Sequence, residues 1–86
     1  MNDPTAPATL YTQAGCVESD SVRAWLTEHG VAFAERDVTG DLNAAKALLA
    51  TGIFATPLLL VGDERVLGFR PAEIARALVD TGIPVP

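Results

Sequence analysis

The segment ATLYTQAGCVES, residues 8–19, carries the strongest indication of the architecture in this chain. Its first part, residues 8–12, is apolar and rich in threonine and predicts a strand, which the following residues end at Gly15. Cys16 stands where a helix is expected to begin, and Glu18 and Asp20 in the first turn complement the positive end of the helix dipole. The segment therefore predicts a strand, a turn and a helix, with the only cysteine of the chain at the junction.

From this unit, apolar spacing and turn residues extend the pattern along the chain. The further elements predicted are a helix over 17–29, a strand over 31–38, a helix over 42–51, a strand over 57–61, its hairpin partner at 65–67, and a helix that starts at Pro71 and ends at Gly82. The order βαβαββα predicts an α/β domain, with a four-stranded mixed sheet flanked by three helices. Its first two strands are expected to pair in parallel through a right-handed crossover, and the later hairpin to add antiparallel strands.

The continuous apolar run at 57–61 predicts an interior strand, because both of its faces must be covered. The more polar strands near Phe33 and Val66 are expected at the edges of the sheet. Residues 7–82 are taken as one domain, with a flexible N-terminal tail at 1–6 and an extended C-terminal tail at 83–86.

Each predicted helix has an apolar stripe that is expected to face the sheet. The stripes are Val22, Trp25, Leu26 and His29 in the first helix, Leu42, Ala45, Leu48 and Leu49 in the second, and Ile74, Ala75, Leu78 and Val79 in the third. Asp41 is expected to cap the second helix. Trp25 fits the helical spacing and is predicted to be a core residue rather than a platform for a ligand.

Composition restricts the classes of function. The chain has 86 residues, a formal net charge of −5, one cysteine and one histidine. An acidic chain without a cluster of Lys and Arg disfavours nucleic acid as a partner, and no apolar run is long enough to span a membrane. One cysteine excludes an intramolecular disulfide and a cysteine-based metal site within one chain, so no metal is predicted. We expect a soluble cytoplasmic domain.

Cys16 is the candidate nucleophile. A lone cysteine is more often a small buried apolar residue, but the start of a helix leaves backbone N–H groups unpaired. The amides of residues 17–19 and the helix dipole favour a thiolate, the reactive form in thiol–disulfide exchange. Glu18 and Asp20 oppose a further negative charge, so we expect only a moderate lowering of the thiol pKa, and we expect both carboxylates to be solvated.

Four segments together resemble the glutaredoxin family, and they span about residues 8 to 80. They are Tyr11-Thr12-Gln13-Ala14-Gly15-Cys16-Val17-Glu18-Ser19, Asp37-Val38-Thr39, Ala55-Thr56-Pro57 and Gly68-Phe69-Arg70-Pro71. Among members, the chain is most similar to the glutaredoxin-like redoxins associated with ribonucleotide reductase. The resemblance implies the thioredoxin fold, a cis Thr56–Pro57 bond facing the nucleophile, and an active-site motif of Cys16, Val17, Glu18 and Ser19. It also implies a set of substrate-binding residues: Tyr11, Gln13, Thr56, Pro57, Gly68, Phe69 and Arg70.

The chain departs from the family pattern at Ser19, which stands where a dithiol redoxin has its second cysteine. A hydroxyl cannot form a disulfide, so Cys16 would act as a monothiol and be released by an external thiol. The sequence leaves open whether Ser19 is natural or an engineered replacement of cysteine. Its hydroxyl is expected to bond to backbone groups in the first turn of the helix.

The expected electron donor and cofactors follow from the same comparison with the family. Gln13 replaces a lysine that glutathione-using members have, and Phe69, Arg70 and Pro71 replace an acidic residue after the last Gly turn. Glutathione is therefore expected as a co-substrate at most, with no tightly bound cofactor, and thioredoxin reductase is the alternative donor. A [2Fe–2S] cluster is disfavoured because the motif is Cys-Val-Glu-Ser rather than Cys-Gly-Phe-Ser. Arg70 is either a surface charge or a partner that offsets Glu18 and Asp20.

The sequence thus predicts a monothiol, glutaredoxin-like thiol–disulfide oxidoreductase that serves electron transport and cell redox homeostasis. Its partner would be a disulfide-containing protein or a low-molecular-weight thiol, and the chain is expected to be a monomer. The alternative is a non-catalytic module with the same fold that binds a protein partner in the same groove.

Overall fold

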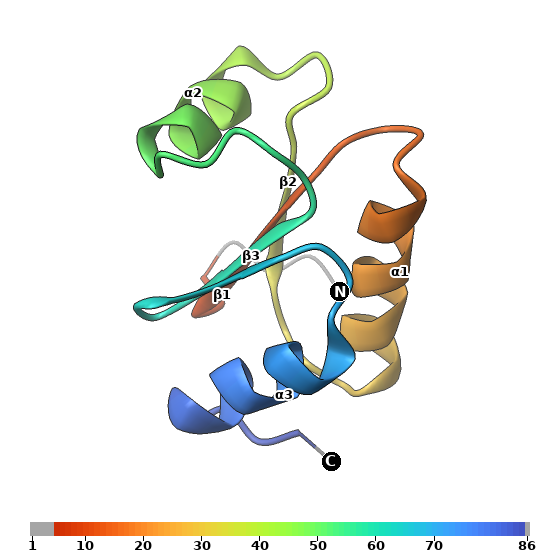
Figure 1. The fold of residues 1–86 in the computed structure, drawn as a ribbon, viewed down its shortest axis with the longest axis vertical. Coiled ribbons are helices and arrows are strands. Elements are labelled where there is room, and N and C mark those ends of the chain that lie inside the picture. The colour runs from red at the N-terminus through yellow and green to blue at the C-terminus, as the bar shows by residue number, and fades with distance from the viewer. Residues whose placement is uncertain (1–4, 86) are drawn as a thin grey trace.

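A computed structural model describes residues 5–85 and gives a three-layer α/β domain within that range (Figure 1). The elements in chain order are β1 (Ala8–Thr12), α1 (Val17–Glu28), β2 (Ala34–Asp37), α2 (Leu42–Ala50), β3 (Leu58–Val61), β4 (Glu64–Leu67) and α3 (Pro71–Asp80). The order βαβαββα and the α/β class are confirmed. Residues 1–4 of the predicted N-terminal tail, and Pro86 at the other end, lie outside the described residues.

The sheet has the strand order β2-β1-β3-β4 in the described part of the chain. Strand β1 runs parallel to β2, with Leu10 opposite Glu35, and antiparallel to β3, with Leu10 opposite Leu59. The β3–β4 hairpin is antiparallel, with Leu59 opposite Val66. The sheet is therefore mixed, with β3 inside and β2 and β4 at the edges, as predicted.

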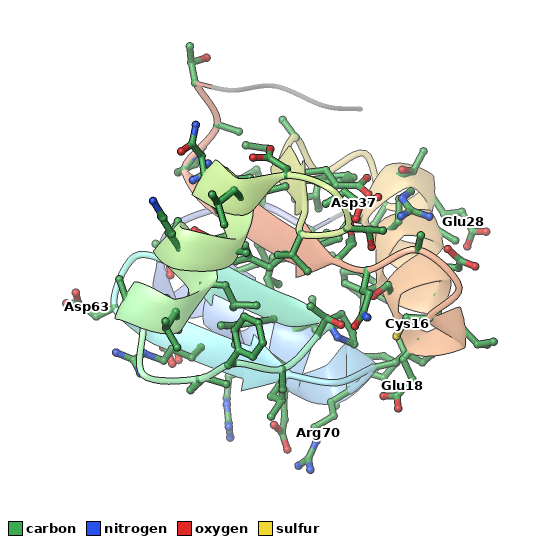
Figure 2. The ribbon with its side chains drawn as sticks, turned by 90° about the horizontal axis from the view of Figure 1, so that it is seen from above. Cys16, Glu18, Glu28, Asp37, Asp63 and Arg70 are labelled. Atoms are coloured by element: carbon green, nitrogen blue, oxygen red, sulfur yellow. The ribbon has the colours of Figure 1, made fainter. Side chains whose placement is uncertain are left out.

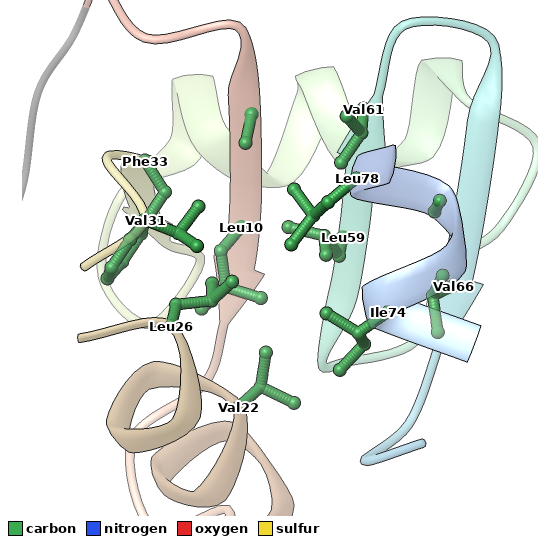
Figure 3. Close-up of a cluster of buried hydrophobic side chains, with 12 residues drawn as sticks. Leu10, Val22, Leu26, Val31, Phe33, Leu59, Val61, Val66, Ile74 and Leu78 are labelled. Atoms are coloured by element: carbon green, nitrogen blue, oxygen red, sulfur yellow. The ribbon is translucent and has the colours of Figure 1, made fainter. Parts of the chain in front are cut away.

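The main core lies between the sheet and the helices α1 and α3 (Figure 3). It consists of Ala8, Leu10, Val22, Leu26, Val31, Phe33, Leu59, Val61, Val66, Ile74, Ala77 and Leu78. A smaller cluster, centred on Tyr11, Leu48 and Leu58, lies on the opposite face under α2. Since each strand alternates its side chains between two faces, Leu10 and Tyr11 fall into different layers. Burial on both faces makes β1 the support for the loop that carries Cys16.

Two predicted helix stripes are partly wrong. In α2, Leu42 and Leu49 are 68% and 62% exposed, whereas Ala44 and Leu48 are buried. In α3, Val79 is 62% exposed and Ala77 is buried in its place. In α2, Leu48 packs with Tyr11 and Leu58. In α3, Ala77 packs in the main core with Ile74 and Leu78. Hydrophobicity alone does not identify the buried face.

The second strand is shorter than predicted. Residues 31–33 precede β2, and Val31 and Phe33 are buried in the main core there instead of extending the strand. At the other end of the chain, Ile83 and Val85 pack against the same core. The Ile83 N–H donates to the carbonyl of Leu78, at 2.8 Å, which turns the segment after α3 back onto the domain. No helix in the described part of the chain has the length and apolar character needed to cross a membrane.

Candidate functional site

Cys16 occupies the N-cap position of α1, at the end of the loop that follows β1 (Figure 2). Gly15 has φ +80°, in the left-handed region that favours glycine, so the chain turns sharply before the cysteine. The backbone N–H of Cys16 donates to the carbonyl of Gln13, at 3.2 Å. The thiol is partly exposed and unpaired in any disulfide. The structure thus places Cys16 where the sequence predicts it, open to a reactant.

The surroundings of Cys16 lower the pKa of its thiol below the ordinary value. The Ser19 hydroxyl contributes most, followed by the Ser19 backbone N–H, and the Glu18 backbone N–H and the Thr56 hydroxyl act in the same direction. Partial burial raises the pKa and offsets some of this effect. Each of these groups lowers the pKa as a hydrogen-bond donor that favours the thiolate. The direction agrees with the thiolate expected at a helix start.

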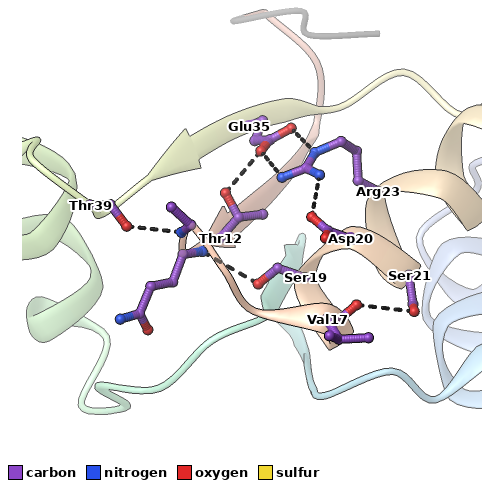
Figure 4. A network of polar contacts seen from close by, with 10 residues as sticks. Thr12, Val17, Ser19, Asp20, Ser21, Arg23, Glu35 and Thr39 are labelled. Atoms are coloured by element: carbon purple, nitrogen blue, oxygen red, sulfur yellow. Dashed lines mark hydrogen bonds and ion pairs between the residues drawn. The ribbon is translucent and has the colours of Figure 1, made fainter.

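Ser19 is completely buried, although a serine hydroxyl is usually solvated. Its Oγ accepts a hydrogen bond from the backbone N–H of Gln13, at 3.3 Å (Figure 4). The next residue, Ala14, donates its N–H to the hydroxyl of Thr39, at 2.9 Å. The expectation that Ser19 bonds within the first helical turn is wrong, because the unpaired donor that it satisfies lies in the loop before the helix. Ser19 and Thr39 together fix the loop that presents Cys16.

The Thr56–Pro57 peptide bond is cis, as the family resemblance implies. The Thr56 hydroxyl donates to the side-chain oxygen of Gln13, at 3.3 Å, across the site. On the other side, the N–H of Gly68 donates to the carbonyl of Pro57, at 2.9 Å. Four predicted substrate-binding residues are therefore brought together beside Cys16 by direct hydrogen bonds.

Glu18 and Asp20 are exposed, as expected, and each also has a partner within the protein. The Glu18 carboxylate accepts a hydrogen bond from the backbone N–H of Phe69, at 2.9 Å and 51 residues away in sequence. Asp20 forms an ion pair with Arg23, at 2.8 Å. Phe69 itself is 38% exposed at this turn. The first turn of α1 is thus joined to the turn before α3, and sequence distance concealed that contact.

Arg70 does not offset Glu18 or Asp20. Its guanidinium pairs with Glu73, at 3.3 Å, with 63% of the side chain exposed, and it points outward from the domain (Figure 2). The interpretation of Arg70 as a surface charge is the one that the geometry supports.

Tyr11 is also placed differently from the other predicted substrate-binding residues. Only 5% of it is exposed, since it packs with Leu48 and Leu58 under α2. The guanidinium of Arg36 lies 5.9 Å from the centre of its ring. Tyr11 therefore supports the site from below and has little surface with which to contact a substrate.

A groove of about 220 Å³ begins at Gln13 and Thr56 and extends toward α2. It is lined by Gln13, Val38, Thr39, Ala45, Leu48, Phe54, Ala55 and Thr56. Phe54 is 65% exposed at its rim and is missing from the predicted site. The available signal was an aromatic residue in the loop at 51–56, where no helical or strand spacing accounts for it.

Trp25 lies toward the other end of α1 and is partly buried against the main core, as predicted. Its ring stacks on that of His29, with centroids 3.9 Å apart, and the His29 Nδ1 lies 2.8 Å from the Trp25 carbonyl. Within residues 5–85, no group of three His, Cys, Asp or Glu side chains is arranged to hold a metal ion.

A family model described as glutaredoxin matches residues 8–66. The chain is 31% identical over 68 residues to the glutaredoxin-like protein NrdH of Lactococcus lactis subsp. cremoris, covering 79% of this chain and 94% of the relative. It is 34% identical over 68 residues to NrdH of Escherichia coli K12, covering 79% and 84% of the two chains.

Solved structures agree with these sequence comparisons. The crystal structure of the thioredoxin-like protein BC3987 superposes with a TM-score of 0.77 at 30% identity, covering 83% of this chain and 99% of that one. The NrdH-redoxin of Escherichia coli superposes with a TM-score of 0.73 at 32% identity, covering 92% and 97%. The fold is thus thioredoxin-like, as predicted.

Proposed function

The chain belongs to the glutaredoxin family, and from this membership we propose that it is a thiol–disulfide oxidoreductase in which Cys16 acts as a monothiol. Membership supports the general class of reaction, thiol–disulfide redox chemistry. The monothiol mechanism rests on one observation: Ser19 fills the buried position next to the Cys16 thiol where a second thiol would be needed. A hydroxyl there stabilises the thiolate but cannot attack the mixed disulfide in place of a second thiol.

The proposed cycle has two exchanges. The Cys16 thiolate attacks one sulfur of a substrate disulfide, a new S–S bond forms to Cys16, and the other half leaves as a thiolate. An external thiolate then attacks the substrate sulfur of this mixed disulfide, and Cys16 leaves as a thiolate. Overall, the substrate disulfide is exchanged for a disulfide between the external thiol and the half that was held on Cys16, and the other half is released as a thiol. No electrons are gained or lost by the protein over the cycle.

Thr56 and Pro57 would hold the substrate backbone beside Cys16, as the family resemblance implies. The groove that continues from Thr56 toward Phe54 suits a disulfide-containing protein, because it offers apolar surface beyond the reacting sulfur atoms. A low-molecular-weight thiol is the proposed electron donor. Thioredoxin reductase is the second candidate, and it would require a resolving thiol that this chain lacks.

A [2Fe–2S] cluster is not part of the proposal. Such a cluster takes thiolate ligands, and the chain supplies one cysteine. The carboxylate of Glu18 lies in the same helical turn as that thiolate, which adds negative charge where a cluster ligated by thiolates is already anionic.

A non-catalytic module that binds a protein partner is the second candidate function. The observation that favours it is the exposure of two apolar side chains, Val17 next to Cys16 at 77% and Phe54 at the rim of the groove at 65%. Apolar side chains at the rim of a groove commonly mark a surface for another protein. A partner bound equally well by Cys16→Ser would favour this function over catalysis.

The test of the proposed oxidoreductase combines two measurements. The rate of Cys16 alkylation by iodoacetamide is followed across pH, and the reduction of a glutathione mixed disulfide is followed with an external thiol in excess. We expect half-maximal alkylation at a lower pH than for a free thiol, multiple turnovers, and no turnover by Cys16→Ser. An unperturbed alkylation profile together with no turnover by the unmodified protein would refute the proposal.

A further inference from the structure

The contact between Glu18 and Phe69 has a bearing on which thiols can reach Cys16. The Glu18 Oε2 atom accepts the Phe69 N–H at 2.9 Å. A Cβ atom added to Gly68 would lie 3.0 Å from the same oxygen, so the carboxylate is packed tightly against this turn. Gly68 is in turn bonded to the carbonyl of Pro57. The carboxylate therefore links the first turn of α1 to the turn at 68–69, which is itself bonded to the loop of the cis proline.

The negative charge of Glu18 is not neutralised locally. In the part of the chain that the structure describes, no Lys, Arg or His forms an ion pair with it. Two arginines on the adjoining segments are already engaged, Arg23 on the same helix with Asp20 and Glu35, and Arg70, which follows Phe69, with Glu73. A carboxylate in the first turn of the nucleophile's helix thus adds a net negative charge to the approach path.

Resting on the monothiol function proposed above, we infer that Glu18 selects the thiol that releases Cys16 from its mixed disulfide, and that it disfavours thiols carrying carboxylates. Two effects combine. The backbone donor at Phe69, which could bind an incoming carboxylate, is already occupied by Glu18. The charge of Glu18 also repels an anionic thiol, whereas a neutral thiol is unaffected and a cationic thiol is attracted.

The step concerned is the second exchange of the cycle. The external thiolate attacks the substrate sulfur, the S–S bond to Cys16 breaks, and its electron pair leaves on Cys16 as a thiolate. The Glu18 carboxylate takes no part in the bonds that form and break in this step. Glu18 is a specificity-determining residue, which acts on the approach of the reagent through charge and through the Phe69 donor.

The experiment measures this step alone, in a single turnover. The full-length protein is converted to the mixed disulfide of Cys16 with 2-mercaptoethanol by excess hydroxyethyl disulfide, and the excess is removed. Release of Cys16 is then followed by mass spectrometry with four reductants: glutathione and 3-mercaptopropionate, which are anionic, 2-mercaptoethanol, which is neutral, and cysteamine, which is cationic. Rates for Glu18→Gln and Glu18→Ala are each divided by the rate of the unmodified protein with the same thiol, so that intrinsic thiol reactivity cancels.

For Glu18→Gln we expect the release rate with the two anionic thiols to rise about threefold relative to the rate with 2-mercaptoethanol. The rate with cysteamine should fall by a similar factor. Both changes are of the size expected for two charges that interact near a protein surface. The gain should shrink at 0.5 M salt, which screens such interactions. Glu18→Ala also frees the Phe69 N–H, so the anionic thiols should gain more than in Glu18→Gln, where the amide oxygen still accepts that bond.

Glu28→Gln is the matched control, because it removes the same charge from the exposed C-terminal end of α1. It should leave all four ratios near one. The inference is overturned if Glu18→Gln changes all four thiols by the same factor, since that would indicate only an altered leaving-group pKa, or if Glu28→Gln gives the same dependence on thiol charge.

Failure of the monothiol function would be separate and visible. In that case the unmodified protein itself would not release Cys16 faster than a small mixed disulfide does in free solution. The four ratios report on Glu18 only when that first comparison shows acceleration.

Discussion

The buried hydroxyl of Ser19 accepts a hydrogen bond from the backbone N–H of Gln13, at 3.3 Å. Residues six apart are thereby joined across the turn that carries Cys16. The bond satisfies a loop donor and holds the hydroxyl where it is the largest influence lowering the Cys16 pKa. A residue that cannot take part in disulfide chemistry is therefore still coupled to it.

Ser19→Ala is expected to raise the Cys16 pKa, because it removes the hydroxyl that lowers this pKa most. Alkylation by iodoacetamide at neutral pH should slow by about fivefold, the value of one hydrogen bond of about 1 kcal/mol. Ser21→Ala is the matched control, since its hydroxyl bonds only to the Val17 carbonyl, at 3.1 Å, in the same helix. Equal rates in Ser19→Ala and the unmodified protein would contradict this assignment. Both are compared where circular dichroism shows them fully folded, because Ser19→Ala also leaves the Gln13 N–H unpaired.

Ser19→Cys is expected to create a second thiol in reach of Cys16 and to convert the cycle to a dithiol one. Cys16 and position 19 are the N-cap and third residue of one helix, a spacing that lets two thiols form a disulfide. We expect the variant, and not the unmodified protein, to turn over with thioredoxin reductase and NADPH. Oxidised Ser19→Cys should show the loss of two hydrogens by mass spectrometry. Turnover by the unmodified protein at the same rate would contradict the monothiol cycle.

Phe54→Ala is expected to weaken the binding of a protein disulfide while leaving a small disulfide unaffected. The side chain is at the rim of the groove and 65% exposed, so its loss removes contact area for a partner with little effect on folding. We expect KM for a protein substrate to rise about fivefold, typical of a peripheral aromatic contact. Leu49→Ala, at 62% exposure on α2, should leave KM unchanged. A parallel rise in KM for hydroxyethyl disulfide would count against a role confined to the groove.

Glu35→Gln is expected to make the free energy of unfolding less dependent on pH in the acid range. Arg23 bonds both oxygens of Glu35, at 2.8 and 2.7 Å, and the Thr12 hydroxyl donates to the same carboxylate at 2.9 Å (Figure 4). The Arg23 hydrogen bonds come first in holding the pKa of Glu35 below its ordinary value. A lowered pKa stabilises the folded protein above the unfolded pKa, and this stability is lost as pH falls through the folded pKa.

The measurement for Glu35 is urea unfolding at pH 7 and at pH 3. The unmodified protein should exceed Glu35→Gln by about 1 kcal/mol at pH 7, a value discounted for the exposure of Arg23, and the difference should shrink at pH 3. Glu64→Gln, on the exposed edge strand β4, is the control and should show no such pH-dependent difference. A constant difference at both pH values would show that the ion pair does not cause the effect.

The order of elements and the sheet topology follow from sequence because their signals are local. The apolar run at 57–61, the Gly62-Asp63 turn and the Pro71 start each act within a few residues. The sequence predicts the buried faces of α2 and α3 less well. Ala44 and Ala77 are buried, while the more apolar Leu42 and Val79 are exposed. Packing between elements decides which face of a helix contacts the sheet. The sequence of the helix alone does not identify that face.

The functional site likewise has a local part that the sequence predicts and a long-range part that it does not. Cys16 and the turn before it are encoded in one short segment, and the sequence places them correctly. The bond from Phe69 to Glu18 joins residues 51 apart, and that from Thr56 to Gln13 joins residues 43 apart. Such partners are chosen by the folded topology. Phe54 is absent from the predicted site for a related reason. Its side chain lines a groove only when the loop at 51–56 lies beside Gln13 and Val38 in the folded protein.

Charged residues make up three of the four positions of β2 and two of the four positions of β4: Glu35, Arg36 and Asp37 on β2, and Glu64 and Arg65 on β4. A strand from another molecule that tried to extend the sheet would have to bring its own backbone alongside these ions and strip them of water. The charges on β2 and β4 therefore disfavour aggregation through the two open edges of the sheet.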